Sequence, residues 1–168
     1  MTPIVIVVMG VSGSGKTTVG RALADELHYA FAEGDKFHSA ANIAKMKGGV
    51  PLDDADRAPW LESLNRFVRQ RAAEGVPTVL TCSALRRAYR DTLRNGTTPE
   101  QVRFVYLRAD RTTLARRLKQ RKGHYMPTSL LDSQLETLEE PDDSEALIID
   151  ADRPVVEIVT EIRRSLFG

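Results

Sequence analysis

The chain has 168 residues, of which 42% are hydrophobic and 28% are charged, and its formal net charge is +1 at pH 7. A chain of this length is typical of one domain that buries roughly 70% of its unfolded surface. The balanced charge argues against general attraction to nucleic acid or to an acidic membrane. The single cysteine, Cys82, excludes an internal disulfide and favours a reducing compartment, so we expect a cytoplasmic protein.

Residues 4–9, IVIVVM, form an apolar and largely β-branched run, which predicts a strand buried on both faces. The run is too short to span a membrane, and it lacks the charged flank and cleavage site of a signal peptide. We therefore expect neither an anchor nor a membrane partner. Residues 10–17, GVSGSGKT, follow directly and fill every fixed position of G-x-x-x-x-G-K-[ST], the phosphate-binding loop.

In such a loop, successive backbone N–H groups turn inward around phosphate oxygens, and glycines permit an approach that a Cβ would obstruct. We expect Lys16 to reach the β- and γ-phosphates of ATP and Thr17 to offer its hydroxyl to Mg²⁺. Val19, Leu23 and Leu27 then recur at helical spacing, so the strand, loop and helix have the required order. The alternative is a plain strand-to-helix turn. The predicted nucleotide-binding residues are Gly10, Ser12, Gly13, Ser14, Gly15, Lys16, Thr17 and Thr18.

Residues 29–32 are expected to form a second short strand, which ends at the sequence Glu33-Gly34-Asp35. Ligands of open parallel sheets bind beyond the carboxyl ends of the strands. Asp35 is therefore a candidate functional carboxylate, although it could instead cap the next helix.

A short helix over residues 39–46 and a loop over 48–52 precede an amphipathic helix over residues 56–73. Trp60 lies on the apolar face of this helix, so we expect it in the core rather than as a stacking platform. Arg57 lies at the helix start, where the macrodipole favours acidic residues. This placement favours an anionic partner for Arg57, with a solvated surface arginine as the alternative.

Residues 77–82 predict a third strand that leads into Ser83, and no aspartate closes it. The carboxylate that many phosphate-loop proteins use near Mg²⁺ must therefore come from Glu33 or Asp35, if one is used. Cys82 has no activating neighbours and is interpreted as a small buried hydrophobic residue. A helix over residues 85–94 follows, and we expect its arginines to form a solvated face: Arg86, Arg87, Arg90 and Arg94.

Residues 102–107 predict a fourth strand, and residues 112–121 predict a further helix. This part of the chain is strongly basic, since eight of residues 103–122 are Lys or Arg. The helix leads into a Gly- and Pro-flanked loop at residues 123–127. This pattern predicts a mobile lid, approximately residues 117–127, that brings guanidinium groups onto phosphates. The alternative is that the cations at the end of this helix only complement the helix dipole, which explains one or two of these charges but not all of them.

The remaining segments are a helix over residues 130–138, a fifth strand over 146–150 and a helix over 155–166. Strands and helices alternate throughout the chain. Together with the phosphate loop after the first strand, the alternation predicts a single three-layer α/β/α P-loop domain, residues 1–168, with a five-stranded parallel sheet.

Several longer strings resemble the gluconate kinases, which are relatives of shikimate and nucleoside-monophosphate kinases. The strings cover most of the chain: GVSGSGKTTVG at 10–20, FAEGDKFH at 31–38, NIAKMKGGVPLDDADRAPWL at 42–61, CSALRRAYRD at 82–91, RKGHYMP at 121–127 and SLLDSQLETLEEP at 129–141. The resemblance implies Mg²⁺-dependent transfer of the ATP γ-phosphate to the 6-hydroxyl of D-gluconate. It also implies a homodimer.

The resemblance also assigns roles to individual residues. Asp35 is similar in position to the residue that orients and deprotonates the attacking hydroxyl, and Arg57 to the residue that meets the substrate carboxylate. Arg117 and Arg121 resemble the lid arginines beside the adenine and the transferred phosphate, so Arg121 joins Lys16 and Asp35 as a catalytic candidate. The segment 149–154 looks like the adenine-contacting turn of these kinases.

A substrate with many hydroxyls needs several polar side chains besides one cationic partner. His38, Ser83 and Gln134 are the candidates for these contacts. Three other functions remain open: a shikimate-like or nucleotide kinase of the same fold, a nucleotide-binding regulatory module without an acceptor, and a nucleic-acid kinase. The last needs a basic track for a polymer, which the net charge and the acidic C-terminal third disfavour.

Overall fold

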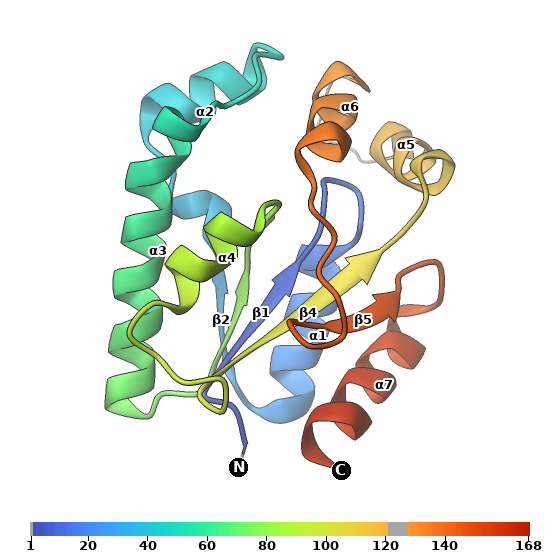
Figure 1. The fold of residues 1–168 in the computed structure, drawn as a ribbon. Helices are drawn as coiled ribbons and strands as arrows, with labels where there is room; N and C mark the ends of the chain where they lie inside the picture. The colour runs from blue at the N-terminus through green and yellow to red at the C-terminus, as the bar shows by residue number, and fades with distance from the viewer. Residues whose placement is uncertain (1, 121–127) are drawn as a thin grey trace.

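The computed structural model describes residues 2–120 and 128–168. The described residues form a five-stranded parallel sheet with helices on both faces (Figure 1). The strands are β1 Val5–Met9, β2 Ala30–Glu33, β3 Thr78–Thr81, β4 Val102–Arg108 and β5 Leu147–Asp150. The helices are α1 Lys16–Leu27, the 3₁₀ helix η1 Gly34–Phe37, α2 Ala40–Lys47, α3 Asp54–Glu74, α4 Arg87–Arg94, α5 Arg111–Gln120, α6 Thr128–Thr137 and α7 Val155–Phe167. The expected α/β/α class and its five parallel strands are confirmed.

The sheet places the phosphate loop at its centre, because its strand order is β2-β3-β1-β4-β5. Thr81 of β3 is in register with both Val8 of β1 and Glu33 of β2. The carboxyl ends of these three strands therefore meet at one edge. The segments that follow them begin with Gly10, Gly34 and Cys82, so three separate parts of the sequence converge there.

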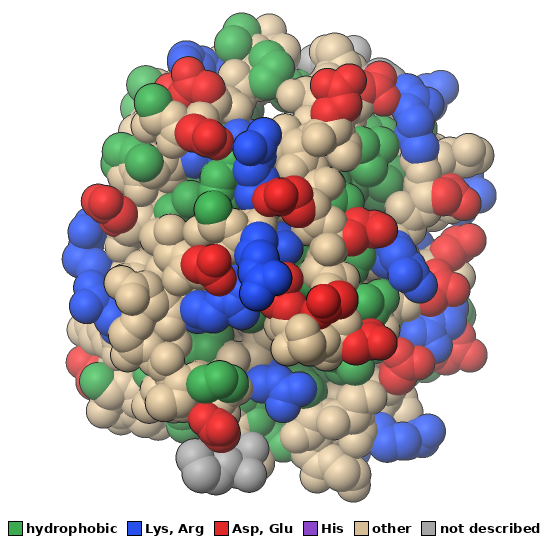
Figure 2. Space-filling model, viewed as in Figure 1, with side chains coloured by type: hydrophobic (Ala, Val, Ile, Leu, Met, Phe, Trp, Pro, Cys, Tyr) green, Lys and Arg blue, Asp and Glu red, His purple; other side chains and the backbone are tan. Residues whose placement is uncertain are grey.

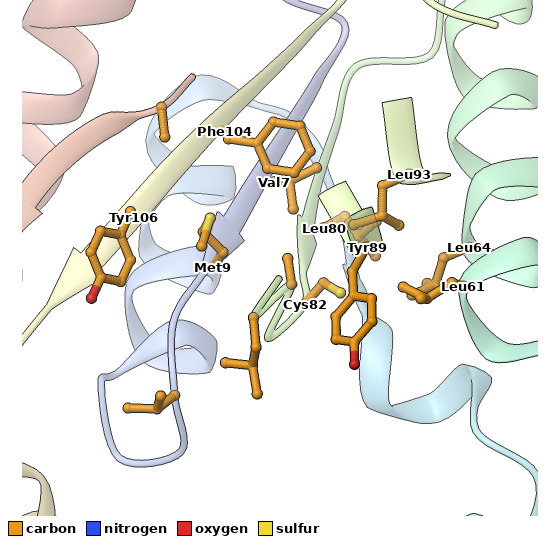
Figure 3. Close-up of a cluster of buried hydrophobic side chains, with 14 of the residues drawn as sticks. Val7, Met9, Leu61, Leu64, Leu80, Cys82, Tyr89, Leu93, Phe104 and Tyr106 are labelled. Carbon is orange, nitrogen blue, oxygen red and sulfur yellow. The ribbon is translucent and has the colours of Figure 1, made fainter. Parts of the chain in front are cut away.

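Alternate residues of β1 divide the core into two halves, as the period of two in a strand requires. Val7 and Met9 face a cluster that contains α3, α4 and parts of α5 and α6 (Figure 3). Ile6 and Val8 face a second cluster, built with α1 and α7. All five residues of β1 are fully buried, as the apolar run of the sequence predicts for a central parallel strand.

Helix α3 begins at Asp54, two residues before the predicted start. Asp53 is the N-cap, and it forms a reciprocal capping box with Asp56. The carboxylate of Asp53 accepts from the backbone N–H of Asp56 at 2.7 Å, and the Asp56 carboxylate accepts from the N–H of Asp53 at 3.1 Å. Arg57 consequently lies at the end of the first turn rather than at the helix start.

The expectation of a solvated arginine face on α4 is wrong for Arg90, which is 1% exposed. Its Nε donates to Glu145 at 2.7 Å, and its two terminal nitrogens donate to the carbonyls of Ala84 at 2.7 Å and Glu139 at 2.9 Å. Burial acts to raise the pKa of Glu145, but hydrogen bonds from Arg90 and Arg94 outweigh it and lower that pKa. The arginine is buried because Glu145, far along the chain, neutralises it.

On the face in Figure 2, acidic and basic side chains are interspersed rather than gathered into one basic track. Within the described part of the chain, no helix combines the length and the apolar character that a membrane crossing requires. The predicted lid, residues 117–127, overlaps residues 121–127, and both that part of the lid and Arg121 lie outside the described residues.

Candidate active site

The larger cavity, of about 320 Å³, opens over the phosphate loop and the start of α1. Its wall contains most of the predicted nucleotide-binding residues: Ser12, Gly13, Ser14, Gly15, Lys16, Thr17 and Thr18. Gly13 has a φ of +87°, and a Cβ there would lie 3.0 Å from the carbonyl oxygen of Leu114, so the loop requires glycine at this point. Gly15 is the N-cap of α1, and no side chain caps that turn. The first turn of α1 lines the cavity, where a helix N-terminus favours an anion.

Lys16 is the first residue of α1, and its ammonium group donates to the carbonyl of Val11 at 3.1 Å. This contact folds the lysine back along the loop, beside the space that the cavity leaves. The cavity thus combines backbone donors, a helix N-terminus and one ammonium group, which together suit a polyphosphate.

Arg117 of α5 joins the loop to the segment after β5. Its Nη1 donates to the carbonyl of Ser14 at 3.2 Å, and its Nη2 donates to the carbonyl of Ala151 at 2.5 Å. These contacts use the edge of the guanidinium and fix its plane, so a face remains for stacking on an aromatic base. Ala151, Arg153, Val155 and Ile158 line the same side of the cavity. Ala151 and Arg153 belong to the segment 149–154 that the sequence resemblance linked to adenine.

A second cavity, of about 70 Å³, lies beside the first. All five predicted substrate-binding residues line it: Asp35, His38, Arg57, Ser83 and Gln134. They come from four separate segments of the sequence, and the structure brings them together. The sequence analysis did not identify the apolar part of this wall, which consists of Met46, Val50, Pro51, Leu52, Leu85 and Leu130. Val50, Pro51 and Leu52 belong to the Gly-Gly-Val-Pro-Leu loop, which the sequence analysis recognised only as a segment that cannot continue a helix. Apolar residues in such a loop were the one sequence signal for this part of the wall.

His38 is held flat against Trp60, with ring centroids 4.0 Å apart and planes 15° from parallel. Trp60 is 3% exposed and donates its indole N–H to the carbonyl of Gly34 at 2.8 Å. The predicted core position of Trp60 is confirmed, and the same ring also forms part of the cavity wall and stacks on an imidazole. Burial lowers the pKa of His38, with the nearby Arg57 acting in the same direction and Asp35 opposing it.

The hydrogen bond of His38 fixes its tautomer. Its Nδ1 lies 3.2 Å from the side-chain amide nitrogen of Asn42, which also donates to the carbonyl of Asp56 at 2.9 Å. Because an amide nitrogen can only donate, Nδ1 accepts, and the proton of the neutral ring is on Nε2. His38 can therefore donate from Nε2 to an oxygen of a ligand.

Gln134 links helix α6 directly to the phosphate loop. Its side-chain oxygen accepts from the backbone N–H of Ser12 at 2.8 Å, and its amide nitrogen donates to the Ser12 hydroxyl at 3.1 Å. The turn after β3 is attached to the same loop, since the N–H of Gly10 donates to the carbonyl of Ser83 at 3.4 Å. Two residues that line the second cavity, Ser83 and Gln134, are thus hydrogen-bonded to the phosphate loop, which lines the first.

Asp35 lies in η1, immediately after β2, and it lines both cavities. Its position depends on Gly34, where an added Cβ would lie 2.2 Å from the carbonyl oxygen of Thr81. The alternative interpretation of Asp35 as a cap for the next helix is wrong. Ser39 is the N-cap of α2, and its hydroxyl accepts from the N–H of Asn42 at 3.1 Å.

A family model described as an AAA domain matches residues 5–141. A gluconokinase of Gluconobacter oxydans (strain 621H) is 51% identical over 148 residues, which are 88% of this chain and 82% of the relative. The thermoresistant gluconokinase of Escherichia coli (strain K12) is 45% identical and aligns with 92% of this chain and 89% of its own length. The chain belongs to the gluconokinase family.

A solved structure of a gluconokinase from Sinorhizobium meliloti 1021 has the same fold as this member of the family. It superposes with a TM-score of 0.87 at 46% identity and covers 98% of this chain and 92% of its own. The resemblance that the sequence strings implied is therefore confirmed at the level of the family and of the fold.

The donor set at the junction of the cavities fits a magnesium ion in this gluconokinase-family chain. Mg²⁺ keeps several waters and takes only one or two protein ligands besides phosphate oxygens. The Thr17 hydroxyl and the Asp35 carboxylate line the nucleotide cavity and are oxygen donors of the required kind. Glu33 instead contacts Arg21 at 3.7 Å. Among the described residues, no group of three or more His, Cys, Asp or Glu side chains is placed to hold a metal ion.

Proposed function

We propose that the chain transfers the γ-phosphate of ATP to the 6-hydroxyl of D-gluconate and releases 6-phospho-D-gluconate and ADP. One observation carries the proposal: Ser12, Lys16 and Asp35 line both the nucleotide cavity and the smaller cavity beside it. A donor in one cavity and an acceptor in the other would therefore meet beside an ammonium group and a carboxylate. Phosphoryl transfer depends on this combination of position and charge.

On the nucleotide side, the loop N–H groups and Lys16 bind the phosphates, and the face of Arg117 stacks on the adenine. The fixed plane of Arg117 supports this role, because its edge is already bonded to loop carbonyls. Arg121 remains a candidate for the transferred phosphate from its place in the sequence alone. Mg²⁺, held by Thr17 with Asp35 nearby, would neutralise phosphate charge when bound.

On the acceptor side, the Arg57 guanidinium binds the carboxylate of gluconate. His38 donates from Nε2 to a hydroxyl, and Ser83 and Gln134 contact further hydroxyls. The distribution of chemistry in the cavity supports an acid with several hydroxyls. Besides Lys16 and Asp35, which line both cavities, it offers one cation, Arg57, among neutral polar groups and an apolar wall.

The reaction then needs only one proton acceptor from the protein. The 6-oxygen of gluconate attacks the γ-phosphorus, its bond to phosphorus forms, and the bond from that phosphorus to the oxygen of ADP breaks. The hydroxyl proton passes to the Asp35 carboxylate, and Lys16 stabilises the charge that moves onto the ADP oxygens.

We also infer a homodimer in the cytoplasm. The dimer is supported by the family resemblance, and the cytoplasm by the single cysteine and by the use of ATP. Light scattering after size-exclusion chromatography measures the oligomeric state, and fractionation of cells measures the location. A monomer at micromolar concentration would contradict the inferred dimer and leave the reaction unaffected.

An ADP-release assay over several acceptors tests the function. The panel contains gluconate, other aldonates, shikimate and nucleoside monophosphates, each with ATP and Mg²⁺. We expect the highest kcat/KM with gluconate. Activity with shikimate or a nucleotide and none with gluconate would identify a different kinase of this fold. Binding of ATP with no acceptor-dependent ADP release from any compound would identify a nucleotide-binding module instead.

A further inference from the structure

Arg57 follows three aspartates, and none of them forms an ion pair with it. Asp53 caps helix α3, and Asp56 bonds to Lys45 at 2.9 Å. Asp54 lies three residues before Arg57 on the same helix, a spacing at which opposite charges ordinarily pair. Among the described residues, no carboxylate lies within ion-pair distance of the Arg57 guanidinium.

A tyrosine from another helix lies between the two charges. Nη1 of Arg57 donates to the hydroxyl of Tyr89 at 3.2 Å, and that hydroxyl is also bonded to Oδ1 of Asp54. The Arg57 guanidinium carbon lies 5.5 Å from the centroid of the Tyr89 ring. Tyr89 belongs to α4, so the contact joins two helices as well as three side chains.

The direction of these hydrogen bonds follows from a count of protons. A guanidinium has only donors, and a tyrosine hydroxyl has one proton. The Tyr89 proton must therefore point to Asp54, and a lone pair of the same oxygen accepts from Arg57. Burial raises the pKa of Tyr89, the contact with Asp54 raises it further, and Arg57 lowers it without reversing the shift. The hydroxyl stays neutral at the pH of a cell.

We propose that Tyr89, oriented by Asp54, is a positioning residue that aims the Arg57 guanidinium into the acceptor cavity and keeps its charge available for the substrate carboxylate. The inference rests on the proposed function, because it assumes that Arg57 meets an acid. It assigns to Tyr89 and Asp54 a role in selecting an anionic acceptor.

The neutral partner has a physical advantage over a direct ion pair. A carboxylate bonded to Arg57 would offset its charge and compete with the carboxylate of the acceptor. A hydroxyl fixes the direction of the guanidinium and leaves the positive charge in place. Asp54 is exposed, so its charge is hydrated, and the high dielectric of the surrounding water makes its attraction for Arg57 across the tyrosine weaker than that of a direct ion pair.

The ring of Tyr89 is anchored well enough to perform this role. The residue is 6% exposed and belongs to the buried cluster between the sheet and α3. Figure 3 shows its ring near Cys82, Leu61 and Leu64, with the hydroxyl directed away from Leu80 and Leu93. Because apolar packing holds the ring, loss of the oxygen alone should leave the fold intact.

The test compares Tyr89→Phe with Tyr106→Phe. Tyr106 is an equally buried tyrosine whose hydroxyl donates to Glu140 at 2.9 Å, and it is not part of the acceptor wall. For each variant, kcat and KM are measured with gluconate and with its neutral amide, gluconamide, and ATP affinity is measured by calorimetry. In Tyr89→Phe we expect KM for gluconate to rise about tenfold, the factor that a hydrogen bond to a charged group represents.

The ratio of kcat/KM between gluconate and gluconamide separates positioning from general damage. In Tyr89→Phe the ratio should fall by a similar factor, with ATP affinity unchanged. A general loosening of the structure would instead lower kcat/KM for both acceptors by the same factor and leave the ratio unchanged. Tyr106→Phe should leave the ratio unchanged. Asp54→Asn keeps an oxygen that can accept from Tyr89, so it should produce a smaller change in the same direction, about threefold.

An unchanged ratio in both Tyr89→Phe and Asp54→Asn overturns the role of Tyr89, even if wild-type protein phosphorylates gluconate. A wild-type protein that does not use gluconate overturns the proposed function itself, and the inference with it. If Tyr89→Phe fails to fold, an unchanged ratio in Asp54→Asn alone overturns the inference.

Discussion

Asp35 and Glu33 leave the same strand end two residues apart, and their side chains have different surroundings. Asp35 lines both cavities, whereas Glu33 contacts Arg21 at 3.7 Å. Gly34 lies between them, against the carbonyl of Thr81, so the chain passes close to β3 before Asp35 enters the junction. The two carboxylates are therefore suited to different tasks, although the sequence analysis named both as candidates near Mg²⁺.

For Asp35→Asn we expect kcat to fall by roughly 10²–10⁴, the usual contribution of a positioned base, because an amide cannot accept the proton of the hydroxyl. The melting temperature should stay close to that of the wild type, since Ser39 rather than Asp35 caps α2. Steady-state ADP release and thermal unfolding give the two values.

Glu33→Gln is the matched control, because it changes an acid at the same strand end that contacts Arg21. We expect less than a threefold change in kcat, consistent with the small energy of a partly exposed ion pair. If Glu33→Gln lost as much activity as Asp35→Asn, the general-base role would belong to Glu33 or to the pair.

At the scale of elements, helix α4 holds the turn that follows β3. Arg90 bonds to the carbonyl of Ala84, a non-glycine residue with a φ of +47°, and to the carbonyl of Glu139, which follows α6. The N–H of Glu139 in turn donates to the carbonyl of Leu85 at 2.7 Å. One buried guanidinium therefore fixes the unusual turn that carries Ser83 and Leu85 into the acceptor wall.

Arg90→Met should lower the free energy of unfolding by about 3–5 kcal/mol, because it leaves the carbonyls of Ala84 and Glu139 without this donor and leaves the buried Glu145 with Arg94 alone of its two arginine partners. In a domain of this size the melting temperature then falls by roughly 6–20 °C, which circular dichroism measures. Arg87→Met is the control on the same helix. Arg87 is exposed, so we expect a change within about 0.5 kcal/mol.

The same site predicts how stability depends on pH. The folded pKa of Glu145 is lowered from its ordinary value of 4.5. Its contribution to stability is therefore fully present above pH 4.5 and is lost as the pH falls below that value.

A stability of Arg90→Met equal to that of the wild type at neutral pH would show that the ion pair contributes no net stability.

Helix α6 is attached to the phosphate loop through Gln134, and this contact makes a separate prediction. Gln134→Glu keeps an oxygen for the N–H of Ser12 but places a negative charge beside the ATP phosphates. We expect ATP affinity to fall at least about tenfold, since like charges near a protein surface repel by more than 1 kcal/mol over a few ångströms. Gln134→Ala loses the contact without adding a charge, so its ATP affinity should fall less than that of Gln134→Glu.

Calorimetric titration with a non-hydrolysable ATP analogue measures both affinities. Gln70→Glu, on the exposed part of α3, controls for the added charge itself and should bind the analogue as the wild type does. Equal affinity of Gln134→Glu and the wild type would mean that α6 and the loop separate when the nucleotide binds.

At the scale of the whole molecule, the sequence predicts the elements better than their partners. All five strands were predicted because each is a short apolar run with a turn at its end, and the phosphate loop was predicted because its spacing is a backbone requirement. The burial of Arg90 was not predicted, since it depends on Glu145, which lies 55 positions away. The same limit applies to Arg57, whose partner Tyr89 lies 32 positions along the chain and on another helix.

Local rules also set the limits of the predicted boundaries and roles. The start of α3 was placed two residues late, because apolar periodicity identifies the buried face of a helix but not its first turn, which here begins after the Asp53 cap. Trp60 was correctly assigned to the core, but periodicity cannot reveal that one edge of a buried ring also lines a cavity. Such a double role is visible only when the elements are assembled.

Trp60 is the only tryptophan of the chain, so its fluorescence reports on one place in the whole molecule. It lines the acceptor cavity together with Arg57. That cavity measures about 70 Å³. Pockets for small molecules are typically about 300 Å³ or larger, so we expect the walls to move apart when a six-carbon acid binds. Because the interior is close-packed, such a movement must change the surroundings of the indole and of the His38 ring stacked on it.

We therefore expect gluconate to change the intensity or emission maximum of Trp60 in a saturable way. A non-hydrolysable ATP analogue alone should have little effect, because the residues that line the nucleotide cavity do not include Trp60. In Arg57→Ala the same change should require at least about tenfold more gluconate, since the cation that meets the carboxylate is gone. A response to the nucleotide but not to gluconate would place the acceptor elsewhere on the molecule, because a ligand in the second cavity lies beside the Trp60 ring.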